Sequence, residues 1–85
     1  MMSALTNEIR DHLSRYLAGD ATLSEFSGWL SPIVWDIEER HDAEAEELAY
    51  AIYLPMAEES GGYITEDRLR EALRPLLAPT AAAAT

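Results

Sequence analysis

An unbroken helical pattern over residues 42–59 constrains the fold of this chain more than any other feature. Apolar side chains recur there at steps of three and four residues, which places them on one helix face: Ala45, Leu48, Ala49, Ile52 and Met56. Asp42 is suited to cap the helix, because its side-chain oxygen accepts hydrogen bonds from the N–H groups of a first turn. Pro55 is expected to bend the last turn, and Ser60-Gly61-Gly62 to end the helix.

A first helix is predicted over residues 3–18 from an apolar stripe at helical spacing. Its N-terminal cap is either Ser3 or Thr6, since both side chains accept from backbone N–H groups. Gly19 follows the last turn, where helices commonly end in a left-handed glycine. We therefore expect a tight turn directly after this helix.

A second helix is predicted over residues 22–40, and it starts with a capping box formed by Thr22 and Glu25. Proline cannot donate its backbone N–H, and it pushes the preceding residue out of the helical region. We therefore expect this helix to be kinked or broken at Ser31-Pro32.

The last helix is predicted over residues 65–77, with Thr65 as its cap. Four helices with short connections favour an antiparallel four-helix bundle, so the fold class is all-α, with one domain over residues 1–78. Residues 79–85 are Ala-rich and are expected to form a flexible tail. The predicted core comprises Leu13, Leu17, Phe26, Leu30, Ile37, Leu48, Ile52, Leu69 and Leu73.

The composition narrows the class of protein. Apolar residues make up 48% of the 85 residues, which is enough for one small core, and cysteine is absent. The net charge of −10 weighs against direct binding to nucleic acid or to an anionic membrane, since both require a basic patch. We expect a soluble, cytoplasmic protein of bacterial type, without a cofactor, whose acidic charge serves a basic protein partner, a cation or only solubility.

Seven of the sixteen acidic residues fall within residues 36–47, where Arg40 is the one arginine. Trp35 and Tyr50 flank this run, and both residue types are common at binding hot spots. The predicted partner-binding residues are therefore Trp35, Asp36, Glu38, Glu39, Asp42, Glu44, Glu46, Glu47 and Tyr50.

Two chemical functions find weak support in the sequence. Glu38 and His41 have the Glu-x-x-His spacing of di-iron bundles, but such a site needs a second copy of that motif and two more glutamates. A solvated helix end is the better interpretation, so no metal site is expected. The serines lack a histidine at a recognisable motif, and the chain has neither cysteine nor lysine, so no enzymatic activity is expected.

Three stretches together resemble the small helical immunity proteins of the colicin D type. They are Tyr16-Leu17-Ala18-Gly19 leading into Ser24-Glu25-Phe26, the tryptophan-containing run up to Glu39, and Ile64-Thr65-Glu66-Asp67-Arg68-Leu69. The resemblance implies a four-helix bundle that presents carboxylates to a basic, tRNA-cleaving toxin domain and blocks its RNA-binding site. It assigns no individual binding residue, and Pro55 and the Ala-rich tail depart from the pattern.

These observations favour a non-enzymatic, acidic binding module of the inhibitor or immunity type, which covers a basic, nucleic-acid-binding surface of a partner protein. The alternative from another class is a small adaptor or oligomerisation domain, in which an apolar helix face binds and the acids serve solubility. A metal-binding bundle is the third hypothesis.

Overall fold

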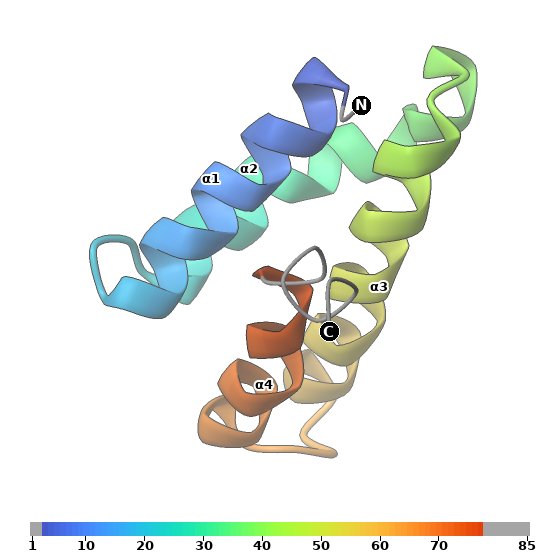
Figure 1. Ribbon diagram of the computed structural model, residues 1–85. Coiled ribbons are helices and arrows are strands. Elements are labelled where there is room, and N and C mark those ends of the chain that lie inside the picture. The colour runs from blue at the N-terminus through green and yellow to red at the C-terminus, as the bar shows by residue number, and fades with distance from the viewer. Residues whose placement is uncertain (1–2, 78–85) are drawn as a thin grey trace.

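The computed structural model describes residues 3–77, and within this range the chain folds into helices with no strand (Figure 1). The elements in chain order are α1 (Ala4–Ala18), α2 (Leu23–Trp35), the 3-10 helix η1 (Ile37–Arg40), α3 (Ala43–Ser60), α4 (Glu66–Leu73) and the 3-10 helix η2 (Arg74–Leu77). The predicted all-α class is thereby confirmed. The predicted tail at 79–85, and the ends of the predicted domain at residues 1, 2 and 78, lie outside the described residues.

All four α-helices begin at a side-chain cap that the sequence predicted. Each cap oxygen accepts from a backbone N–H three residues later, over 3.0–3.3 Å; the caps are Ser3, Thr22, Asp42 and Thr65. Glu25 completes the capping box by accepting from the N–H of Thr22 at 2.8 Å. Of the two candidates for α1, the cap is Ser3, and Thr6 is instead buried.

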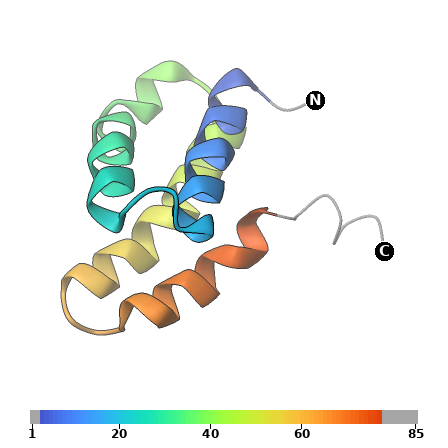
Figure 2. The same cartoon turned by 90° about the vertical axis from the view of Figure 1, so that its left-hand side faces the viewer.

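The helices form two hairpins, because short loops force consecutive helices to run antiparallel. Gly19, with a φ of 88°, turns the chain from α1 into α2, and residues 61–65 connect α3 to α4. Figures 1 and 2 both show α1 beside α2, and α4 beside the second half of α3. Helix α3 packs against α1, α2 and α4, while η2 returns to α1.

Of the two alternatives predicted at Ser31-Pro32, a break is wrong and a kink stays a prediction. Helix α2 continues through Pro32 to Trp35, and the change to 3-10 geometry comes at Asp36. Proline removes the hydrogen bond to the carbonyl of Gly28 four residues earlier. Both residues are exposed, so this part of α2 lies at the surface, where water can replace the missing hydrogen bond. The helix is therefore not forced to end there.

Seven of the nine predicted core residues are buried. The prediction is wrong in part for Leu17 and Leu48, because both are only half-buried at the margin of the core. Tyr16 takes the buried position at the end of α1, where its ring stacks on Phe26 with centroids 5.6 Å apart. On α3 the centre of the buried face is formed by Ala45, Ala49, Ile52 and Met56. Leu48 lies beside that line, towards α1 and η2.

Candidate protein-binding surface

The turn between α2 and α3 presents an aromatic ring and carboxylates together. Trp35 ends α2, and 85% of its surface is exposed. Ile37, the first residue of η1, is fully buried and anchors the turn in the core. Glu38 and Glu39 follow within the same turn of 3-10 helix and are exposed, since the anchored turn directs them away from the core.

His41 makes the sharp connection from η1 to α3. Its φ of 54° lies in the left-handed region, which is uncommon for residues other than glycine, although histidine is among those enriched there. The next residue, Asp42, is half-buried, and its carboxylate accepts from the N–H of Ala45 at 3.1 Å. One carboxylate of the acidic run, that of Asp42, therefore caps the N-terminus of α3.

The remaining glutamates divide between two faces of α3. Glu44 and Glu47 are one turn apart and line a crevice of about 260 Å³ that also contains Arg10 of α1. Oε1 of Glu44 accepts from the backbone N–H of Ser3 at 2.9 Å, which ties the start of α1 to α3. Glu46 is offset from Glu44 by two residues, roughly 200° around the helix, and is half-buried on another face. The predicted surface is therefore not one continuous acidic face.

Few of these charges are paired. Among the described residues, the one ion pair of the run joins Asp36 and Arg40 at 3.8 Å, with both side chains about half-exposed. A pair of this kind contributes little to stability, because water screens it. Glu38, Glu39, Glu46 and Glu47 have neither an ion pair nor a side-chain hydrogen bond within residues 3–77. They repel one another and attract a cationic surface.

Tyr50 contributes less surface than expected. It lies one turn after Glu46, but it is half-buried and packs against the core cluster. Of the two aromatic residues predicted to bind a partner, Trp35 is therefore exposed and Tyr50 is only partly exposed.

The two residues of the Glu-x-x-His spacing are both exposed, at the surface of the turn. Within residues 3–77 no three side chains of histidine, aspartate or glutamate converge in a way that holds a metal ion. Glu38 and His41 thus lie in the acidic turn as surface residues.

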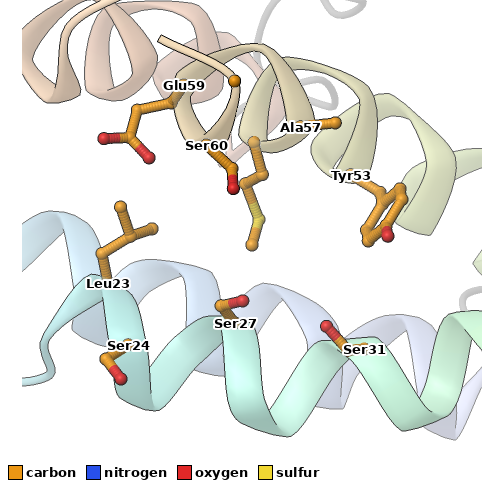
Figure 3. A pocket seen from close by; sticks show the side chains of 10 residues that line it. Leu23, Ser24, Ser27, Ser31, Tyr53, Ala57, Glu59 and Ser60 are labelled. Carbon is orange, nitrogen blue, oxygen red and sulfur yellow. The ribbon is translucent and has the colours of Figure 1, made fainter.

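A groove that was not predicted from the sequence lies between α2 and α3, with a volume of about 560 Å³ (Figure 3). Serines line the α2 side at positions 24, 27 and 31, opposite Tyr53 and Glu59 of α3. The signal was present in the sequence, since these serines recur at steps of three and four residues, as core residues do. An apolar stripe does not include these serines, because they are polar.

Comparison of the chain with protein-family models, with curated proteins and with solved structures found no match. None of the helices within residues 3–77 combines the length and the apolar character needed to cross a bilayer. Function is therefore inferred from the geometry and charge of the described residues.

Proposed function

We propose that this protein is a non-enzymatic binding module that covers a basic surface of a partner protein, in the manner of an inhibitor or immunity protein. We define the acidic corner as Trp35, Asp36, Glu38, Glu39, Asp42, Glu44, Glu46 and Glu47. The contact surface is its turn and the Glu46 side of α3, since Glu44 and Glu47 lie on another face of that helix. The observation that carries this proposal is the 85% exposed indole of Trp35, followed three and four residues later in the same turn by the exposed Glu38 and Glu39.

An exposed tryptophan in a small domain is suited to anchor a partner. Burial of its large ring supplies apolar contact area at low conformational cost, and tryptophan is enriched among residues that dominate binding energy. The carboxylates around Trp35 supply the complementary component, because opposite charges steer a basic partner towards the same place. An apolar anchor within a charged rim is the usual anatomy of a specific interface.

The projecting carboxylates indicate which kind of basic surface this protein could bind. Carboxylates that project from a turn offer acceptor oxygens to arginine and lysine, as the phosphates of a nucleic acid do. A partner whose cleft binds nucleic acid presents such cations already ordered. The protein would compete with nucleic acid for that cleft.

The adaptor hypothesis requires a shared apolar face, and the exposed large apolar side chains do not support one. Among the described residues they are Trp35 at the end of α2, Leu54 on α3 and Tyr63 in the loop after α3. These three come from separate elements and form no stripe along one helix. This distribution favours the acidic corner over an apolar helix face.

The decisive experiment compares two variants that remove the same charge. The corner variant is Glu38→Gln/Glu39→Gln/Glu46→Gln, and the control variant is Glu8→Gln/Glu58→Gln/Asp67→Asn. None of these six side chains has a hydrogen bond or ion pair within residues 3–77. Proteins captured from a lysate at low salt are purified, and their association rates with both variants are measured between about 50 and 500 mM salt.

We expect a captured basic protein to associate quickly with the wild type and the control variant, and several-fold more slowly with the corner variant. Trp35→Ala should mainly accelerate dissociation, because it removes a buried anchor rather than a charge. Equal association rates for the two triple variants, or binding that ignores salt, would favour the adaptor hypothesis.

A further inference from the structure

The groove between α2 and α3 is open along its length and mixed in character. Figure 3 shows Leu23 and Ser31 rising from α2, and Tyr53, Glu59 and Ser60 reaching towards them from α3. Met56 contributes to the apolar lining and is itself almost fully buried. The volume of the groove, about 560 Å³, is sufficient for one or two long side chains.

The groove exists because α2 has serines where a closed bundle would have larger apolar residues. Ser24, Ser27 and Ser31 share one face of α2 and line the groove opposite α3. Their side chains are too short to fill the space between the helices. The chain thereby forgoes apolar burial along this seam, a local departure from efficient packing of the kind found at functional sites.

The polar groups of the lining are free to bind. Ser27, Ser31, Tyr53 and Glu59 are half-buried, and none of them has a side-chain hydrogen bond within residues 3–77. Glu59 is the one charged residue of the lining. A half-buried carboxylate among hydroxyl groups is suited to a cationic hydrogen-bond donor, since a charged donor gives the stronger bond.

The groove leads towards the acidic corner. Trp35 follows Ser31 by four residues and therefore lies on the same face of α2, one turn beyond the lining. On α3, Glu46 precedes Tyr53 by seven residues, which again returns to the same face. A segment lying in the groove thus reaches Trp35 and Glu46 at one end.

We propose that this groove binds an arginine- or lysine-bearing segment of the basic partner, an inference that rests on the proposed function for the existence of that partner. The cationic head group meets the carboxylate of Glu59 and the nearby hydroxyls. The aliphatic stem lies along Leu23 and Met56, as long basic side chains do on apolar surface. Charge complementarity selects this occupant, because no cation lines the groove and the whole chain carries −10.

The test uses hexa-arginine as the probe and the backbone amide signals of the full chain as the readout. We expect saturable shifts at Ser27, Ser31, Tyr53 and Glu59. Glu59→Gln should weaken binding roughly tenfold, as the loss of one charge-assisted hydrogen bond does. Glu58→Gln is the matched control, because it removes the same charge one residue away and lies outside this lining.

A second pair of variants tests the space itself. Ser27→Leu/Ser31→Leu fills the groove and should abolish the shifts there, whereas Ser14→Leu at an exposed position of α1 should leave them unchanged. If the filled variant does not fold, the comparison of Glu59 with Glu58 decides alone. Equal weakening by Glu59→Gln and Glu58→Gln would overturn the groove as a binding site.

The two proposals fail separately. If the groove shifts are absent but the corner variant still slows association with the partner, the proposed function stands and the groove proposal falls. If Glu59→Gln weakens hexa-arginine binding while the corner variant behaves like its control, the groove binds cations and the acidic corner is not the contact surface.

Discussion

The hydroxyl of Tyr16 donates a hydrogen bond of 2.9 Å to Oε2 of Glu66, fifty residues further along the chain. Arg70 completes the contact: its guanidinium lies 4.4 Å above the Tyr16 ring and donates to the backbone carbonyl of Tyr16 at 3.2 Å. These three residues join the end of α1 to the start of α4. The contact holds the second hairpin against the first.

The first prediction concerns alkaline stability. Burial raises the pKa of Tyr16 above its ordinary value of about 10, and the hydrogen bond to Glu66 raises it further. The unfolded chain therefore loses this proton first, and stability falls as the pH rises above about 10. Tyr16→Phe should lose about 1 kcal/mol near neutral pH and show a shallower alkaline decline in urea unfolding.

The chain has no lysine, so no lysine ammonium group contributes to the pH profile in this range, and the comparison with Tyr16→Phe isolates Tyr16 from the other tyrosines. Tyr63→Phe, at a position 82% exposed, is the control for phenol removal. Parallel pH profiles for the wild type and Tyr16→Phe would contradict the prediction.

The second prediction separates two positions on α3. Ile52 is fully buried, so Ile52→Ala should cost about 2–5 kcal/mol of unfolding free energy through lost burial and the cavity left behind. Leu48 is half-buried beside a crevice, so Leu48→Ala should cost clearly less. Denaturant unfolding of both variants measures which one loses more unfolding free energy. A larger loss in Leu48→Ala would mean that the Leu48 side of α3, rather than the Ile52 side, faces the core.

The third prediction uses two of the left-handed residues that follow helices, His41 and Gly19. His41→Gly should raise stability by about 0.5–1 kcal/mol, because glycine adopts a φ of 54° without the clash of a Cβ. Gly19→Ala should lower stability by about 1 kcal/mol, although no atom lies within 4 Å of the added Cβ. The two melting temperatures should therefore move in opposite directions, and a loss in His41→Gly would mean that the imidazole contributes more than the backbone costs.

The fourth prediction concerns repulsion within the acidic corner. Glu38→Gln/Glu39→Gln should stabilise the protein by a few tenths of a kcal/mol at low salt, since two unpaired charges leave a crowded run. The gain should disappear in high salt, where the charges are screened. Thermal unfolding at two salt concentrations measures it, with Glu8→Gln/Glu58→Gln as the comparison, and an equal gain in both would indicate total charge rather than local crowding.

The starts of the helices were predictable because a cap is a local event. Thr22 and Glu25 satisfy each other across three residues, and no distant part of the chain is needed. The break in α2 was predicted wrongly for the opposite reason. Whether Pro32 ends a helix depends on what surrounds the carbonyl it leaves free, and the sequence does not show that this part of α2 lies at the surface.

Burial was harder to predict at the margins. Tyr16 and Leu17 are adjacent and both suit an apolar stripe, and the choice between them depends on Phe26 and Glu66. Neither partner is near in sequence, so periodicity alone does not separate the two. The acids were predicted to form one surface, but the offset of two residues between Glu44 and Glu46, roughly 200° around a helix, already separates them. Whether the acidic corner binds a partner stays a prediction.

The contact between Tyr16 and Glu66 also bears on the order of events during folding. Each hairpin joins neighbours in sequence and closes only a short loop, whereas this contact requires the ends of a fifty-residue segment to meet. The hairpins should therefore form early, and the link between α1 and α4 should form after the main barrier. If the link forms in that order, it slows unfolding. Its loss would therefore raise the unfolding rate and leave the folding rate nearly unchanged.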